Sequence, residues 1–274
     1  MCPHFHTPVN RQRGFTLVEL IMVIVIMGVI GGVVAVFMRA PIDAYFDSAR
    51  RAALTDVADT AVRRMARDVR KALPNSIRVP SATCLEFIPT RTGGRYRTVD
   101  AAAGTALDFT VADTQFNMLG RNSLLPADQQ IQPGDVVAVY NLGIPGASAY
   151  AQENTAVIAA GGVVDGGVET AITIAARQFP LESGSNRFHV IPTEERVVAY
   201  VCTGNTLRRT VTTGSFTSAC PATGPILATN VQSCAFVYNG SDLQRNGLVQ
   251  IDLRISSNNE TVSLYHEVHV NNSP

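Results

Sequence analysis

The sequence predicts an α+β protein in which one long N-terminal helix packs on an antiparallel, β-rich head. The longest apolar run, residues 15–39 with the arginine that closes it, leads directly into a segment of helical periodicity, residues 40–74. From residue 75 to residue 274 the pattern changes to short runs of strand-forming residues, separated by Gly, Pro, Asn, Asp and Ser. One helix followed by many short strands is typical of a helix packed on an antiparallel sheet.

The composition narrows the function classes. The chain has 274 residues, enough for one large domain or two small ones, and 22 basic residues balance 22 acidic ones. A net charge of zero gives no general attraction to nucleic acid, so we expect no nucleic-acid partner. Charged residues make up only 16% of the chain, which favours a protein that buries or anchors much of its surface.

The apolar run predicts a transmembrane helix. It contains 24 residues from Phe15 to Met38, and about 20 apolar residues suffice to cross a bilayer as a helix. The leader before it, MCPHFHTPVNRQRG (residues 1–14), carries Arg11 and Arg13, so the positive-inside rule places the leader in the cytoplasm and the head on the far side. No A-x-A cleavage site closes the run, so we expect the helix to remain on the mature protein.

Glu19 is the one charged residue between Phe15 and Met38. A carboxylate within a spanning segment costs about 2.5–3.5 kcal/mol on insertion scales, and such residues usually mark a function. A cation at the same depth would offset that cost. Cleavage between Gly14 and Phe15 would create one, a free amine at Phe15, which could pair with Glu19 within one helix or between two staggered helices.

The sequence G-F-T-L-V-E-L, from Gly14 to Leu20, resembles the class III signal of type IV pilins and type II secretion pseudopilins. In that family a prepilin peptidase cleaves after the glycine and methylates the new N-terminal amine. The glutamate then pairs with the N-terminus of a neighbouring subunit during assembly. The resemblance therefore implies that Gly14 directs cleavage, that Phe15 becomes N-methylated and that Glu19 acts in assembly.

The chain departs from many major pilins in the middle of this helix. Where those have a proline, it has Gly28, Gly31 and Gly32. Glycines there could allow local melting of the helix within a filament, or could permit close helix packing, and both interpretations stay open.

Beyond the membrane the helix is expected to be amphipathic and to continue to Leu73, kinked at Pro41 and ended by Pro74. Its expected apolar stripe recurs every three or four residues: Ile42, Phe46, Ala49, Ala53, Val57, Ala61, Met65, Val69 and Leu73. The opposite face is rich in Asp and Arg, which indicates a solvated surface.

Eleven short runs in the head have the composition of strands. They are CLEFIPT (84–90), ALDFTVA (106–112), DVVAVYN (135–141), NTAVIAA (154–160), TAITIA (170–175), FHVI (188–191), RVVAYVC (196–202), TLRRTVT (206–212), SCAFVYN (233–239), LVQIDLRIS (248–256) and VSLYHEVHV (262–270).

Cysteines indicate an oxidising compartment. Cys2 lies in the leader, and the other four predict two disulfides, with four buried free thiols as the alternative. Of three connectivities we favour Cys202–Cys220, which would close a hairpin across a Thr/Gly-rich stretch, and this leaves Cys84–Cys234. None of these cysteines lies in a C-x-x-C, so a metal site is not expected.

No catalytic, metal-binding or cofactor-binding residues are predicted, and we expect a protein that is not an enzyme. The segment His266-Glu267-Val268-His269 suggests zinc, but its histidines are three apart in a predicted strand and would point to opposite faces. No G-x-S-x-G motif supports a serine hydrolase.

The C-terminal stretch from Val231 to Pro274, with its long alternating strands, resembles the larger minor pilins. The resemblance is to the O-type minor pilin of MSHA (mannose-sensitive haemagglutinin) pili, and more distantly to J-type pseudopilins of type II secretion. It implies a bacterial inner-membrane protein with a periplasmic head that reaches the pilus or cell surface, where adhesion by the head is compatible with a tip position. The implied partners are a prepilin peptidase, the major pilin, other minor pilins and an inner-membrane assembly platform. The alternatives are a J-type pseudopilin, or a membrane-anchored periplasmic enzyme or binding protein.

Overall fold

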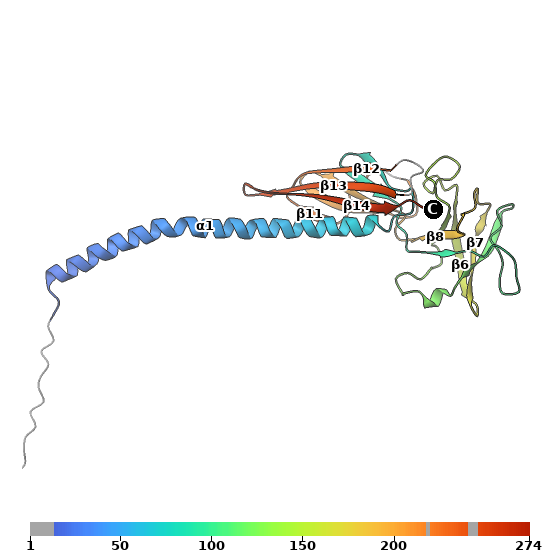
Figure 1. Ribbon diagram of the computed structural model, residues 1–274, viewed down its shortest axis with the longest axis horizontal. Coiled ribbons are helices and arrows are strands. Elements are labelled where there is room, and N and C mark those ends of the chain that lie inside the picture. The colour runs from blue at the N-terminus through green and yellow to red at the C-terminus, as the bar shows by residue number, and fades with distance from the viewer. Residues whose placement is uncertain (1–13, 218–219, 241–245) are drawn as a thin grey trace, which may run out of the picture. The chain divides into compact units, whose positions relative to one another are not determined.

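The computed structural model describes residues 14–217, 220–240 and 246–274 (Figure 1). Residues 1–13, which hold Cys2, Arg11, Arg13 and nearly all of the expected leader, lie outside the described residues. The chain divides into two compact units, Met1–Ala52 and Ala53–Pro274, which are described separately. The α+β fold class is confirmed, because one long helix is followed by antiparallel strands.

Helix α1 extends from Leu17 to Val69 and confirms the expectation of one continuous helix. Pro41 lies inside it without ending it. The last turn carries Arg67, a favourable position for a cation next to the helix carbonyl groups. After it, Lys71 donates its N–H to the carbonyl of Asp68 at 3.0 Å, a tighter turn that ends the helix ahead of Pro74.

In the second unit, one face of α1 packs into the core of the head. Its buried residues are Leu54, Ala58, Ala61, Val62, Met65, Ala66 and Val69. The expected stripe is therefore confirmed at Ala61, Met65 and Val69 and is wrong before them. Ala53 and Val57 are exposed, and Leu54 and Ala58 are buried instead. Ile42, Phe46 and Ala49 are exposed as well.

Two antiparallel sheets enclose this core with α1. The five-stranded sheet has the order β1-β2-β9-β10-β11. The three-stranded sheet has the order β12-β13-β14. Their strands are β1 (Arg78–Ser81), β2 (Cys84–Phe87), β9 (Val197–Thr203), β10 (Thr206–Thr212), β11 (Ile226–Thr229), β12 (Val231–Asn239), β13 (Asn246–Ser257) and β14 (Glu260–Asn271). In β13 the side chains of Val249, Ile251, Leu253 and Ile255 are fully buried, and their burial helps to stabilise the sheet against the helix.

Residues 88–196 form a second lobe, here called the inserted lobe. Phe87 of β2 pairs with Val198 of β9, so the chain leaves and re-enters the five-stranded sheet at adjacent positions. The lobe has its own core and a six-stranded sheet of order β3-β8-β5-β6-β7-β4, beyond the C-terminal end of α1 (Figure 1). Its elements are β3 (Thr92–Arg95), β4 (Asp113–Leu119), the 3₁₀ turn η1 (Asn122–Leu124), β5 (Val136–Val139), β6 (Thr155–Asp165), β7 (Glu169–Arg177) and β8 (Arg187–Ile191). A bridge between Tyr96 and Met118 brings the two ends of this sheet together.

A partly buried ionic network fixes the end of α1 on the five-stranded sheet. Arg209 of β10 donates to Asp68 of α1 and to Glu195, each at 2.8 Å, and the Tyr200 hydroxyl donates to Asp68 at 2.7 Å. Burial lowers the pKa of Arg209, but the hydrogen bonds to Glu195 and Asp68 outweigh it and raise this pKa above its ordinary value. Removal of the guanidinium would leave two carboxylates without their cation, which is why such networks tolerate substitution poorly.

Ten of the eleven expected strands are confirmed, and the strand expected at 106–112 is wrong. There the Asp108 carboxylate accepts a hydrogen bond from the N–H of Thr110 at 2.7 Å, a local turn that competes with the strand, and β4 begins only at Asp113. Strands β1, β3, β4 and β11 were not expected. The first two carry Pro80 and the pair Gly93-Gly94, which disfavour a strand assignment.

The two expected disulfides are present, but the favoured pairing is wrong. The bonds join Cys84 to Cys220 and Cys202 to Cys234, with Cα atoms 6.2 and 6.4 Å apart. Cys202 cannot close a hairpin with Cys220, because β9 turns into β10 directly and sets Cys202 opposite Leu207. Instead the middle of β12 lies against the β1–β2 hairpin, where the Phe236 N–H donates to the Ala82 carbonyl at 2.8 Å, and the disulfide joins Cys234 of this strand to Cys202.

Replacing Cys84 and Cys220 by alanine is expected to destabilise the head by about 5 kcal/mol, and the Cys202/Cys234 pair by about 4 kcal/mol. The larger loss of stability is expected for the disulfide that closes the longer loop, because the two bonded pairs are 136 and 32 residues apart in sequence. Urea unfolding of the full chain in detergent micelles measures both values, and non-reducing peptide mapping checks the links. A peptide pair that joins Cys202 to Cys220 would contradict the connectivity.

Candidate functional site at the start of the N-terminal helix

The Gly14–Phe15 bond lies in an open, non-helical segment. Residues 14–16 precede the first residue of α1, Leu17, and all three are exposed. The Phe15 side chain is 79% exposed, and a Cβ atom added to Gly14 would meet nothing within 4 Å. The described chain therefore presents this bond without steric protection by its own residues.

Thr16 is the N-cap of α1. Its Oγ1 accepts the backbone N–H of Glu19 at 3.3 Å, and its carbonyl accepts the N–H of Leu20 at 3.1 Å. The pattern Thr-x-x-Glu ahead of an apolar run is that of a capping box, in which the N-cap hydroxyl satisfies the N–H of the residue three positions later. The role of Thr16 was missed in the sequence reasoning, although T-L-V-E was a sufficient signal.

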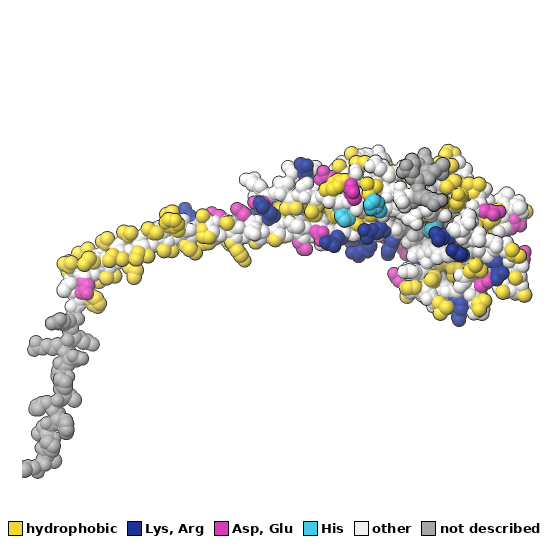
Figure 2. All heavy atoms as spheres, viewed as in Figure 1, with side chains coloured by type: hydrophobic (Ala, Val, Ile, Leu, Met, Phe, Trp, Pro, Cys, Tyr) yellow, Lys and Arg dark blue, Asp and Glu magenta, His cyan; other side chains and the backbone are white. Residues whose placement is uncertain are grey.

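The part of the chain around α1 that belongs to the first unit exposes a continuous apolar surface (Figure 2). Its large apolar side chains are 46–79% exposed: Phe15, Leu17, Val18, Leu20, Ile21, Met22, Val23, Ile24, Val25, Ile26, Met27, Val29, Ile30, Val33, Val34, Val36, Phe37, Met38, Ile42, Tyr45 and Phe46. At about 1.5–3 kcal/mol for each side chain fully buried, covering this surface is worth on the order of tens of kcal/mol. By length and composition the helix can cross a membrane, which indicates membrane anchoring.

This apolar surface has no side chains at three positions, Gly28, Gly31 and Gly32. A Cβ atom added at any of the three would meet nothing within 4 Å, so no packing in the described part of the chain requires a glycine there. Any reason for these glycines must therefore come from a neighbouring helix or from the backbone itself.

Glu19 is exposed on the same surface and makes no ion pair with any residue that the structure describes. The nearest cation in the helix sequence is Arg39, twenty positions later. An unpaired carboxylate is costly at the depth of an apolar span, and a cation at that depth would offset the cost.

The comparisons with known proteins bear on this segment. A protein-family model described as "Prokaryotic N-terminal methylation motif" matches residues 9–35. The chain carries a type IV pilin-like prepilin signal. The matched segment is about a tenth of the chain, and it includes Gly14, Phe15 and Glu19. No curated protein and no solved structure matches the chain.

The remaining residues singled out in the sequence lie apart from one another in the head. His266 and His269 are on opposite faces of β14, as the alternating burial of that strand shows. Cys84, Glu86 and Cys220 offer ligand atoms within 4.8 Å of one another, but both sulfur atoms belong to one disulfide and cannot act as thiolates. Glu86 is instead paired with Arg78, whose guanidinium lies 3.5 Å above the Tyr150 ring.

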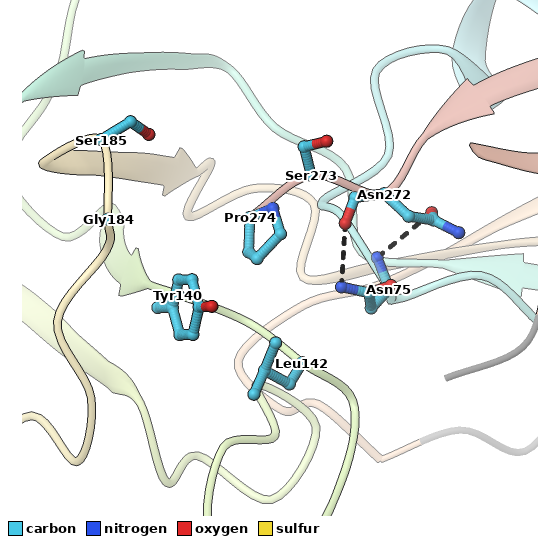
Figure 3. A pocket seen from close by; sticks show the side chains of 8 residues that line it. All are labelled: Asn75, Tyr140, Leu142, Gly184, Ser185, Asn272, Ser273 and Pro274. Atoms are coloured by element: carbon cyan, nitrogen blue, oxygen red, sulfur yellow. Dashed lines mark hydrogen bonds between the residues drawn. The ribbon is translucent and has the colours of Figure 1, made fainter. Parts of the chain in front are cut away.

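One hollow of about 360 Å³ lies between the inserted lobe and the C-terminal residues (Figure 3). Tyr140 and Pro274 face each other across it, and Gly184 and Ser185 line it from a loop at the left of the view (Figure 3). Asn75 donates through its side-chain amide to the carbonyl of Asn272 at 3.2 Å, which holds the C-terminal segment against the end of the helix. The lining side chains are uncharged and include the apolar Leu142 and Pro274, and the polar Asn75 and Asn272 are already hydrogen-bonded to each other.

Proposed function

We propose that this chain is a minor pilin: a structural subunit of a type IV, MSHA-like pilus, processed by a prepilin peptidase and polymerised through its N-terminal helix. One observation carries the proposal. The matched methylation motif includes Gly14 and Phe15, and these lie in an accessible segment directly before a helix with an exposed apolar surface, on which Glu19 has no ion-pair partner among the described residues. A structural role, rather than catalysis, is what such a motif indicates.

The proposed mechanism is assembly in three steps. Hydrolysis of the Gly14–Phe15 bond removes the leader and frees the amine of Phe15, which is then N-methylated. The Glu19 carboxylate of one subunit pairs with the amine of a neighbour, the major pilin or another minor pilin, so that neither charge remains unpaired in the apolar filament core. The exposed side chains between Leu17 and Phe46 then exchange lipid contacts for helix–helix contacts, and the head faces outward.

A tip or priming position is favoured over the shaft. In a filament of staggered parallel helices, the space beyond the C-terminal end of each helix is needed for the head of the next subunit. The inserted lobe adds residues 88–196 at that end of α1 (Figure 1). A subunit that terminates the filament, or initiates it on the inner-membrane assembly platform, has no such neighbour to accommodate.

A J-type pseudopilin of type II secretion is the second candidate, since the same signal serves both systems and the C-terminal stretch resembles both. Cross-linking in the native cell separates them, through recovery of pilus subunits or of small pseudopilins. A membrane-anchored periplasmic enzyme or binding protein would instead retain its leader.

The first test is the intact mass and N-terminal sequence of the protein recovered from its own membrane. We expect a chain that begins at N-methylated Phe15. A chain that still begins at Met1, in a cell with an active prepilin peptidase, would overturn the proposal.

A further inference from the structure

Two arginines lie directly opposite each other on neighbouring strands of the inserted lobe. Strands β3 and β8 are antiparallel, and their register pairs Arg95 with Arg187. Tyr96 donates its N–H to the carbonyl of Asn186 at 2.9 Å. Because hydrogen-bonded and non-hydrogen-bonded pairs alternate along an antiparallel ladder, the adjacent pair, Arg95 and Arg187, falls at a non-hydrogen-bonded position. Cα atoms at such positions are about 4.5 Å apart and their side chains lie close together. Like charges directly opposite each other destabilise a sheet unless something compensates them.

The chain supplies no compensation within its described residues. Neither Arg95 nor Arg187 has a carboxylate within 4.0 Å in the ranges that the structure covers, although the other arginines of the lobe all have an oxygen partner. These pairings are Arg91 with Asp135 and Glu194, Arg97 with Glu169, Arg121 with Asp165, Arg177 with the carbonyl of Thr155, and Arg196 with the carbonyl of Gly134.

Both arginines are among the residues that line a hollow of about 230 Å³, together with Gly93, Gly94, Phe188 and His189. Gly94 faces the core, where an added Cβ atom would lie 2.9 Å from the Phe188 ring. Gly93 is exposed opposite His189, where an added Cβ atom would lie 3.0 Å from the carbonyl oxygen of Phe188 and 3.6 Å from the His189 ring. Both arginines are exposed and His189 is half-buried, so the hollow is reachable from solvent.

The third polar group, His189, is uncharged at neutral pH. Burial, with the positive charge of Arg187, lowers the pKa of its imidazole to about 4. The imidazole can therefore donate one hydrogen bond without adding a further charge to the hollow.

We propose that this hollow is an anion-binding site for a compact oxyanion, a carboxylate, sulfate or phosphate group, bound between Arg95 and Arg187 with His189 as a neutral donor. Guanidinium groups match the geometry of such oxyanions through paired N–H donors. The bound anion would turn the unfavourable opposition of two cations into a favourable arrangement. The site lies in the inserted lobe, and the proposal does not depend on how the N-terminal helix is processed.

Isothermal titration of the full chain in detergent micelles at pH 7 tests the proposal, with sodium sulfate, phosphate and acetate as separate probes at constant ionic strength in chloride. We expect saturable binding of at least one of them, weakened about tenfold or more in Arg95→Gln and in Arg187→Gln. The strongest probe identifies the ligand chemistry: sulfate or phosphate for a tetrahedral group, acetate for a carboxylate.

Arg254→Gln is the matched control, because Arg254 is an exposed arginine of β13 and lies opposite the uncharged Ser263 of β14. Its affinity for the anion should be unchanged. A second measurement, the thermal midpoint at low ionic strength, should rise in Arg187→Gln, whereas a merely structural arginine would lower it on removal. Absence of saturable binding for all three probes, or equal binding in the wild type and both variants, would overturn the proposal.

Discussion

Substitution of leucine for Gly14 is expected to leave the protein in the membrane with its leader attached. Because the position of the added side chain is open in this chain, the substitution disturbs no contact of the described residues. Any loss of cleavage must then arise in the active site of the peptidase, which has to accommodate the residue before the scissile bond. Even a small added side chain in a fitted pocket costs about tenfold or more in rate, so we expect the processed fraction to fall at least about tenfold.

Intact-mass measurement of the membrane fraction distinguishes the two forms, which differ by the fourteen residues of the leader. Gly28→Leu is the matched control, since its added side chain also meets open space but lies well inside the apolar helix. This control should be processed like the wild type. A Gly14→Leu chain that begins at Phe15 as often as the wild type would contradict the assignment of Gly14 to the cleavage site.

The segment on which this prediction depends could be interpreted from sequence because its information is local. Gly14, Phe15 and Glu19 lie within six consecutive residues, and the helix that follows is specified by apolar length. Helical periodicity also predicted burial at Ala61, Met65 and Val69. It could not show where burial starts, because that depends on which sheets cover the helix, and the sheets are built from distant residues.

The errors in the head have the same cause. Cys202 and Cys220 are close in sequence, but strand order in the sheets decides which sulfur atoms meet, and this order brings together Cys84 and Cys220, 136 residues apart. The run ALDFTVA has strand composition, yet two hydrogen bonds from Thr110 to Asp108 favour a turn. Pairing of strands and side-chain turns are not encoded in composition.

The opposition of Arg95 and Arg187 shows most clearly what could not be predicted from the sequence. The two residues are 92 positions apart and neither belongs to a motif. Only the register of β3 against β8 makes them neighbours, and β3 was not expected as a strand because two of its four residues are glycine. Thr16, by contrast, could have been identified as an N-cap from its four-residue pattern.

Substitution of glutamine for Glu19 is expected to leave cleavage intact and to prevent assembly. The N-cap hydrogen bond runs from the backbone N–H of Glu19 to the Thr16 hydroxyl, so a change of the Glu19 side chain preserves it. What is lost is the carboxylate. If Glu19 pairs with the Phe15 amine of a neighbour, that amine becomes an unpaired charge in an apolar core, which costs about 3–5 kcal/mol. Incorporation into filaments should then fall about a hundredfold or more.

Sheared surface filaments and the membrane fraction, compared by immunoblot with the processed mass confirmed, measure this effect. Asp43→Asn is the matched control, since Asp43 is an exposed carboxylate of the same helix outside the apolar run. It should assemble like the wild type, because solvent compensates for a lost exposed charge. Retention of the processed Glu19→Gln chain in the membrane would separate an assembly defect from a processing defect. Wild-type incorporation of the variant would mean that the carboxylate pairs with no neighbour, and another reason for a charge at that depth would be required.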